Sequence, residues 1–272
     1  IKNFKGELET TCLTSRSNDG QLMFMLHMLS KMKDPKDGGS RIASVHNGSA
    51  LFTGDAGSGE SGIRQYIIEN DLLECIVQLP NDIFYNTGIA TYVWFVTNVK
   101  EKKRKGKVQL INASSEAFYR KMRKSLGSKR NELIPEHIEI IQDLYFDFEE
   151  NEYSKIFDNE DFGFYQITVN QPEKDDKGNI IKDSKGKSKS DSKLKDIENV
   201  PMKEPIDNYF KREVLPFAPD AWYDKTKMKV GYEIAFNKYF YQYEGLRTLK
   251  DIAADILILE QETDGLLKEI IA

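Results

Sequence analysis

Two strongly apolar segments that stand close together constrain the fold most. Residues 72–79 read LLECIVQL, and residues 89–96 read IATYVWFV. Short apolar runs rich in β-branched and aromatic residues are typical of strands that are buried on both faces. Shorter strand-like segments at 41–46 and 108–112 and a helical segment at 63–70 accompany them. Together these elements predict an α/β fold with one side of a doubly wound sheet.

The sequence changes character beyond residue 113. Residues 116–124 are basic and predict a helix, residues 135–145 predict a second helix with Pro at an early position, and residues 162–170 alternate like a strand. Residues 172–198 hold 8 Lys, 7 Asp or Glu and almost no apolar side chains, which is typical of a flexible surface excursion. We expect three parts: a domain over 1–112, an α+β region over 113–245 that contains this excursion, and a C-terminal helix over 246–272.

Apolar residues recur along the last helix at alternating spacings of three and four residues. This spacing is typical of a seam that packs on other helices. The seam could dock on the helices of a partner or pack against its own domain, and both interpretations stay open. Its apolar members are Leu249, Ile252, Ile256, Leu259, Leu266 and Ile270.

The charge of the chain is unevenly distributed. The formal net charge is −5, but residues 100–130 hold 12 Lys or Arg and 2 Glu, so this segment carries +10 and the remainder −15. A basic segment on an acidic protein can bind phosphates, although charge runs are usually solvated surface. The candidate phosphate contacts are Lys102, Lys103, Arg104, Lys105, Arg120 and Arg123.

Several classes of protein are excluded by residue counts. Two cysteines and three scattered histidines do not supply a disulfide framework or a metal site. No stretch approaches 18 uninterrupted apolar residues, so we expect no membrane span. A reducing, cytoplasmic setting fits this composition best. The chain begins with Ile1 in place of an initiator Met, which suggests a fragment or a processed product.

A glycine-rich segment at 57–62 matches the pattern G-x-G-x-x-G. A dinucleotide site needs these glycines directly after a strand, but about ten residues separate them from the strand at 41–46. The overlapping segment 54–61 resembles a P-loop in which Glu60 replaces the Lys, and a carboxylate there would repel phosphates. We therefore expect a flexible surface loop, with a nucleotide-binding oxidoreductase as a remote alternative.

The segment between the two apolar strands, PNDIFYNTG, carries two adjacent aromatic residues, Phe84 and Tyr85. Loops at strand ends of α/β sheets often carry binding sites because the sheet holds them rigidly. One ring could be presented to a planar ligand. The alternative is that both rings cap the core.

A family resemblance joins these features. The segment GGSRIASVHNGSALFTGDAGSGESGIRQYIIENDLLECIVQLPNDIFYNTGIATYVWFVTN resembles the modification (M) subunit of type I restriction–modification systems. So do RKGKVQLINAS, VPMKEPIDNYFKREVLPFAPDAW and GYEIAFNKYFY. These subunits are site-specific DNA methyltransferases that transfer a methyl group from S-adenosylmethionine to N6 of adenine. The resemblance implies that residues 1–112 form the C-terminal half of a Rossmann-like methyltransferase sheet.

Two motifs of that family are missing here. The family binds S-adenosylmethionine through a glycine-containing motif at its first strand and holds the target adenine with Asn-Pro-Pro-Phe/Tyr after its fourth. No Asn-Pro-Pro occurs in this sequence, and the family places both motifs upstream of the segment matching 21–33. The resemblance therefore implies that this chain contains no catalytic residue, binds neither cofactor nor metal, and is inactive alone. The alternative is a non-catalytic, methyltransferase-like scaffold.

The resemblance also implies site residues and partners. Adenine must be flipped out of the duplex and stacked between side chains, and related enzymes place one stacking aromatic in the loop matching 80–88. This implies that Phe84 stacks on the base, with Tyr85 as second choice and Asn86 and Thr87 shaping the loop. The implied partners are DNA, the specificity (S) subunit, which would dock on 246–272, and the restriction (R) subunit.

Overall fold

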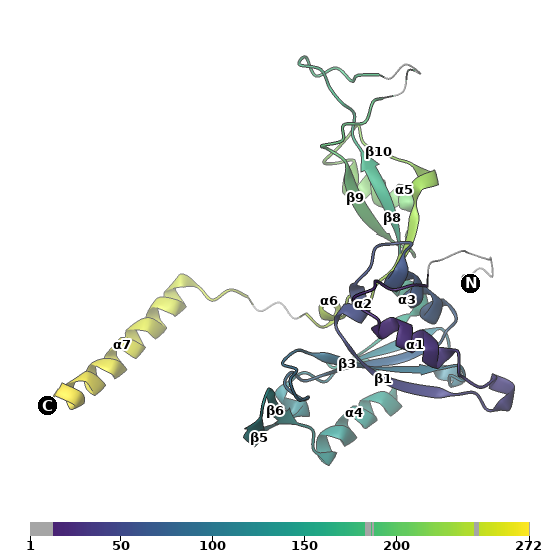
Figure 1. Cartoon of the computed structure of the whole chain (residues 1–272). Helices are drawn as coiled ribbons and strands as arrows, with labels where there is room; N and C mark the ends of the chain where they lie inside the picture. The colour runs from purple at the N-terminus through teal and green to yellow at the C-terminus, as the bar shows by residue number, and fades with distance from the viewer. Residues whose placement is uncertain (1–12, 183–185, 187, 242–244, 272) are drawn as a thin grey trace. The chain divides into compact units, whose positions relative to one another are not determined.

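The computed structural model describes residues 13–182, 186, 188–241 and 245–271 (Figure 1). The chain divides into two compact units, Ile1–Phe240 and Tyr241–Ala272. Within the described ranges, no helix is long and apolar enough to span a membrane.

The first unit is built on a mixed five-stranded sheet with the order β1-β3-β2-β4-β7. Strands β1, β2 and β4 run in one direction, and β3 and β7 run antiparallel to their neighbours. The predicted α/β class is confirmed, and β2 is buried on both faces as its apolar run predicts. The strands are β1 (Arg41–Asn47), β2 (Leu73–Leu79), β3 (Thr91–Thr97), β4 (Lys107–Asn112) and β7 (Ser154–Asp158).

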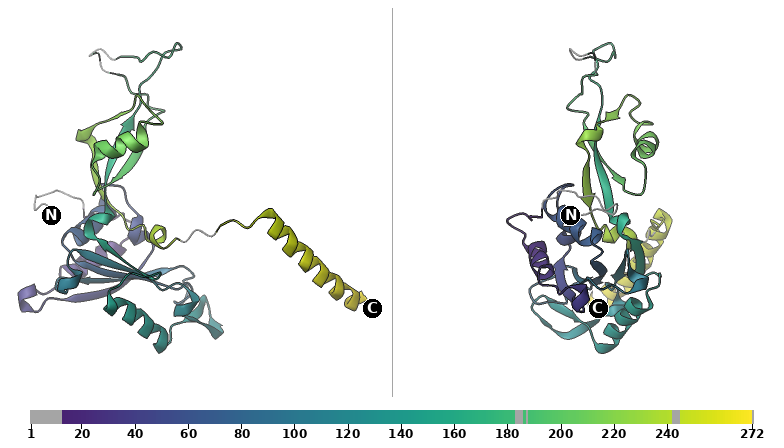
Figure 2. Two further views of the ribbon diagram at one scale, coloured as in Figure 1. Left: turned by 180° about the vertical axis from the view of Figure 1, so that it is seen from behind. Right: turned by 90° about the vertical axis from the view of Figure 1, so that its right-hand side faces the viewer.

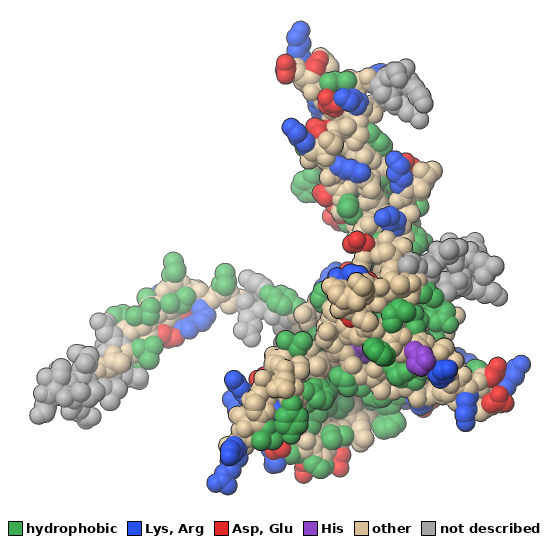
Figure 3. Space-filling view, in the orientation of Figure 1, with side chains coloured by type: hydrophobic (Ala, Val, Ile, Leu, Met, Phe, Trp, Pro, Cys, Tyr) green, Lys and Arg blue, Asp and Glu red, His purple; other side chains and the backbone are tan. Residues whose placement is uncertain are grey.

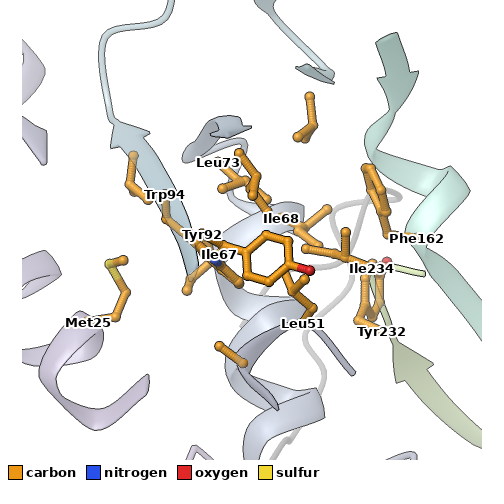
Figure 4. Packing of buried hydrophobic residues seen from close by; sticks show 14 of the residues in the cluster. Met25, Leu51, Ile67, Ile68, Leu73, Tyr92, Trp94, Phe162, Tyr232 and Ile234 are labelled. Carbon is orange, nitrogen blue, oxygen red and sulfur yellow. The ribbon is translucent and has the colours of Figure 1, made fainter. Parts of the chain in front are cut away.

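Helices cover both faces of this sheet (Figure 2). Side chains alternate along each strand, so Ile76 and Leu110 join the larger core on one face, while Val77 and Ile111 join a second core on the other. Figure 4 shows the larger core, in which Trp94 lies among helical side chains. The first face packs against α1 (Gln21–Leu29), α2 (Ser49–Phe52) and α3 (Gly59–Glu69), and the second against α4 (Pro135–Asp147).

A second, smaller sheet has its own core. Its central strand β8 pairs antiparallel with β9, β10 and β11, and the segment 171–195 joins β8 to β9. Ile167 and Val200 pack against Phe210 and Val214 of a π-helical turn. The elements are β8 (Gly163–Asn170), β9 (Asp196–Pro201), α5 (Ile206–Tyr209), the π-helical turn (Phe210–Val214), β10 (Trp222–Tyr223) and β11 (Lys229–Tyr232). The short helix α6 (Phe236–Phe240) follows β11 and packs in the larger core of the first sheet.

A buried arginine joins α3 to β11. Arg64 Nε donates a hydrogen bond of 2.6 Å to the Tyr232 carbonyl, and Nη1 donates one of 3.1 Å to the Ala50 carbonyl. Burial lowers the pKa of Arg64 to about 10, so the side chain stays a cation at neutral pH. Ser61 Oγ accepts a 2.9 Å bond from the Tyr232 N–H. These contacts fix the end of the second sheet against α3.

The predicted helix at 116–124 is wrong. Glu116–Phe118 form a short 3-10 turn, and β5 (Arg120–Leu126) pairs antiparallel with β6 (Lys129–Glu132). Leu126 opposes Lys129, so Gly127 and Ser128 make a two-residue hairpin loop. Gly127 has φ +64°, a backbone conformation that such tight turns require. The tight turn therefore favours a β-hairpin in place of the predicted helix.

The second unit contains α7 (Leu249–Ile271), which confirms the predicted C-terminal helix. Leu249, Ile252, Ile256 and Leu259 are exposed in the described part of this unit. The side chains of the other two seam positions, Leu266 and Ile270, lie outside the described residues.

Candidate nucleic-acid interface

One edge of the five-stranded sheet gathers the loops that follow its parallel strands. Because β1, β2 and β4 run in one direction, their carboxyl ends at Asn47, Leu79 and Asn112 share this edge. In α/β sheets, ligands bind at the carboxyl ends of the strands. The loop 80–90, which connects β2 to β3, lies at this edge.

The aromatic pair of this loop is at the surface. Phe84 is 38 % exposed and Tyr85 is 62 % exposed, whereas the neighbouring Ile83 is buried. Phe84 bridges to Thr87, and between them Asn86 takes a left-handed conformation with φ +57°. The core is therefore capped by Ile83 and the two rings are available to a ligand, which argues against the alternative in which both rings cap the core.

The β5–β6 hairpin is bound directly to this loop. The Asp82 carbonyl accepts hydrogen bonds from the backbone N–H groups of Arg130 (3.0 Å) and Asn131 (3.2 Å). Asn131 Nδ2 donates a further bond of 2.9 Å to the Asn81 carbonyl. The hairpin and the aromatic loop are thus held together through backbone groups.

Two contacts extend this junction to the hairpin tip. Lys129 Nζ lies 5.5 Å from the centroid of the Tyr85 ring. A Cβ atom at Gly127 would lie 3.8 Å from Asn86 Oδ1, so the turn is close to the loop. We call residues 81–88 together with 120–132 the hairpin–loop surface.

The hairpin–loop surface is strongly basic. Between Arg120 and Glu132 the sequence holds six cationic side chains and one carboxylate, that of Glu132 itself. Arg120 Nε pairs with Glu132 Oε1 at 2.7 Å, and the side chain of Arg123 is exposed. Figure 3 shows Lys and Arg side chains gathered around the hairpin at the lower left. The arrangement places cations for phosphates beside rings for bases, as nucleic-acid binding requires.

The other predicted basic group lies at the opposite edge of the sheet, because it precedes the amino end of β4. Arg104 is 1 % exposed; its guanidinium lies 4.1 Å from the centroid of the Tyr145 ring and 4.4 Å from that of Phe148. It donates to Gln109 Oε1 at 3.0 Å and also to the Tyr145 carbonyl. Arg104 is therefore a packing residue, and its prediction as a phosphate contact is corrected.

The three lysines around Arg104 stay exposed. Lys103 Nζ donates a 2.8 Å hydrogen bond to the Phe146 carbonyl, which holds it against α4. Lys102 and Lys105 are not brought to the edge that carries the aromatic loop. The structure thus places Arg120 and Arg123 on the hairpin that is hydrogen-bonded to the aromatic loop, and leaves the 102–105 group apart from them.

The glycine-rich segment opens α3, and its residues 59–62 are buried, so the predicted surface loop is wrong. Glu60 fills the turn: it accepts bonds from Arg16 N (3.2 Å) and Nε (2.9 Å), and a Cβ at Gly54 would lie 3.0 Å from Glu60 Oε2. Burial acts to raise the pKa of Glu60, but the hydrogen bonds from its own backbone N–H and from Arg16 together outweigh burial and lower the pKa. This filled, anionic turn does not fit a dinucleotide or a nucleotide phosphate.

Two hairpin cations, Lys129 and Arg130, were missed by the sequence reasoning. The signal was the dipeptide Gly127-Ser128, which is typical of a two-residue hairpin loop. In the part of the chain that the structure describes, no group of His, Cys, Asp or Glu is arranged to hold a metal ion.

Comparison with known proteins identifies the family of the chain. Residues 3–171 match the family model for N-6 DNA methylases. The methylase subunit of the type I restriction enzyme MjaIX from Methanocaldococcus jannaschii is 39% identical over 97 residues, which are 36% of this chain and 16% of that protein. The HindI methylase subunit from Haemophilus influenzae is 48% identical over 54 residues, 20% of this chain and 12% of that protein.

A solved structure resembles part of the chain. The type I restriction–modification methyltransferase subunit from Streptococcus thermophilus aligns with TM-score 0.46 and 26% identity, covering 54% of this chain and 28% of that one. The matched segments span less than a fifth of the length of the two curated relatives. The family model, in contrast, covers more than half of this sequence, and the chain therefore belongs to the N-6 DNA methylase family.

Proposed function

We propose that this chain is part of the DNA-modification subunit of a type I restriction–modification system. The complete subunit transfers a methyl group from S-adenosylmethionine to N6 of adenine in DNA. The observation that carries the proposal is the exposed Phe84 on a loop bound to a basic hairpin. Family membership and the names of the curated relatives support it. Since its substrate is DNA, we also infer that the complete subunit works in the cytoplasm.

The aromatic loop binds the target base in this proposal. Adenine inside a duplex is unreachable, so it is flipped out and stacked on an aromatic ring. Phe84 provides that ring, with Tyr85 as second choice, while Asn86 and Thr87 shape the loop. Arg120 and Arg123 neutralise the phosphates beside the flipped nucleotide.

The catalytic and cofactor groups come from outside this chain. The sequence contains no Asn-Pro-Pro, whose acceptors would localise the lone pair of the adenine amine, and the glycine-rich turn is filled by Glu60. Within the described residues, β1 pairs with β3 on one side and its other edge has no strand partner. An open strand edge offers unpaired N–H and C=O groups. We propose that the strands carrying the missing motifs pair there, so the 272-residue chain alone transfers no methyl group.

The test is Phe84→Ala in a complete modification subunit with its partners. Loss of one stacking ring costs about 1–3 kcal/mol, so the methylation rate should fall about 5- to 150-fold. Phe217→Ala is the matched control, because Phe217 is an exposed Phe that lies outside the hairpin–loop surface. Unchanged methylation by Phe84→Ala contradicts the assignment. A complete subunit that never methylates DNA leaves the non-catalytic scaffold as the function.

We propose that α7 is the contact for the specificity subunit. In type I systems the specificity subunit determines which DNA sequence the modification subunit acts on. A restriction subunit also joins the assembly. An exposed apolar seam at Leu249, Ile252, Ile256 and Leu259 suits a helical partner. Replacing Ile252 and Ile256 by Glu should abolish capture of the specificity subunit, whereas Lys250→Glu should not. Capture that survives both Glu substitutions removes α7 from the contact.

A further inference from the structure

We propose that Leu126, at the tip of the basic hairpin, is a wedge that enters the DNA stack when the target base leaves it. The inference rests on the proposed function, because base flipping opens the gap that the wedge would fill. Proteins that distort DNA often insert an apolar side chain between bases to hold the opened stack. Nothing in the sequence pattern pointed to this leucine.

The position of Leu126 has no folding explanation. It is 43 % exposed, and it belongs to none of the three hydrophobic clusters of the described chain. It precedes the two-residue loop of Gly127 and Ser128, so it stands where the hairpin turns. A leucine exposed at a turn exposes apolar area to water, and insertion between bases would remove that area from water.

The charges around Leu126 suit a duplex. Lys124 precedes it by two residues, and Lys129 and Arg130 follow on the other strand. From Arg120 to Asn131 there is no Asp or Glu to repel phosphates. Cations on both sides of an apolar tip can hold the two phosphate backbones while the tip enters between them.

The wedge and the stacking ring are held in one rigid arrangement. Lys129, which opposes Leu126 in the hairpin, lies over the Tyr85 ring at 5.5 Å. The Asp82 carbonyl binds two backbone N–H groups of β6. Phe84 is two residues further along the loop. A base that moves onto Phe84 therefore leaves its gap in the stack close to the hairpin tip.

Ile89, an exposed aliphatic residue of the loop 80–90, is an alternative candidate for the wedge. Ile89 is exposed and lies just before β3. It has no neighbouring Lys or Arg within the loop 80–90, whereas Leu126 has cations on both strands of the hairpin. Leu126 is the better candidate on charge, and Ile89 belongs in the experiment.

The experiment measures binding of this 272-residue chain to two short duplexes of one sequence, one intact and one with a central abasic site. An abasic site supplies the gap without the cost of unstacking a base, so a wedge favours it. Fluorescence anisotropy should give about five-fold tighter binding to the abasic duplex, equivalent to about 1 kcal/mol. Leu126→Ala should remove this preference and Leu126→Met should restore most of it, while Leu194→Ala, at a similarly exposed leucine, should keep it.

Three results overturn the inference: no duplex binding by the chain, no abasic preference in the wild type, or an unchanged preference in Leu126→Ala. Loss of the preference in Ile89→Ala alone assigns the wedge to Ile89. The methylation assay on the complete subunit is independent of this readout. If the abasic preference depends on Leu126 but the complete subunit does not methylate DNA, the proposed function is wrong and the wedge stands. If the complete subunit methylates DNA but the chain shows no abasic preference, the wedge is wrong and the proposed function stands.

Discussion

Lys129 Nζ lies 5.5 Å from the centroid of the Tyr85 ring, and this contact joins the basic hairpin to the aromatic loop. The two residues are far apart in the sequence and belong to different elements. The ammonium group rests on the π-face of the tyrosine and stays partly accessible. It therefore places a cation on the loop that carries Phe84, where it could contact a phosphate of a flipped nucleotide.

Replacement of Lys129 tests whether this cation contacts DNA. Lys129→Gln should weaken duplex binding and reduce the slope of log affinity against log salt by about one unit, because one fewer counterion is released. Titration of a duplex at several salt concentrations measures both. Lys193→Gln, at an exposed lysine outside the hairpin–loop surface, should change neither. Equal slopes for Lys129→Gln and the wild type would exclude a phosphate contact by Lys129.

Arg104 should contribute to stability and not to DNA binding. Arg104→Ala removes the guanidinium from between the Tyr145 and Phe148 rings and leaves Gln109 without this donor. We expect the free energy of unfolding to fall by about 2–4 kcal/mol, since packing and buried hydrogen bonds are lost together. Urea unfolding measures this loss.

The matched control is Lys102→Ala, in the same short turn but exposed. Its free energy of unfolding should stay within about 0.5 kcal/mol of the wild type. If Arg104→Ala is as stable as Lys102→Ala, the buried stack does not stabilise the fold.

Arg64 should be important for joining the two sheets. Arg64→Met keeps most of the side-chain volume but leaves the Ala50 carbonyl without the Arg64 donor, and leaves the Tyr232 carbonyl with a longer bond of 3.4 Å from Ser61 Oγ in place of the 2.6 Å bond from Arg64. Each unsatisfied buried carbonyl costs about 1–3 kcal/mol, so unfolding in urea should begin at clearly lower concentration. Arg123→Met, at an exposed position, should unfold like the wild type. A midpoint unchanged in Arg64→Met would show that the bonds are replaced by others.

The sheet was predictable because local signals determine it. The apolar run that contains Ile76 and Val77 is short and has no helical periodicity, which favours a strand that is buried on both faces. The order of the strands was not predictable, because β3 inserts between β1 and β2 through pairing that no local pattern records. Phe84 could be placed on a strand-end loop from the same runs, and its exposure agrees with that prediction.

The β5–β6 hairpin and the burial of Arg104 could not be predicted from the sequence. A row of cations from Arg120 to Lys124 has high helical propensity, but Gly127 and the bonds to the Asp82 carbonyl select a strand pair. Arg104 looks like its lysine neighbours in the sequence. Only the packing of α4 brings Tyr145 against its guanidinium and removes it from the surface.

His46 should make the stability of the fold depend on pH. It is buried beside Trp94, with ring centroids 5.4 Å apart, and within the described residues neither ring nitrogen has a hydrogen-bond partner. Burial lowers the pKa of His46 to about 4, against about 6.5 in an unfolded chain. Between these values the unfolded state binds more protons, so stability is complete above about pH 6.5 and is lost as the pH falls toward 4.

The loss between pH 7 and pH 5 should be on the order of 2 kcal/mol, measured by urea unfolding at both values. His46→Phe keeps a ring in the core and cannot be protonated, so most of this loss should disappear. His27→Phe, at an exposed histidine of α1, should retain it. If His46→Phe loses as much stability on acidification as the wild type, groups other than a buried neutral His46 cause the pH dependence.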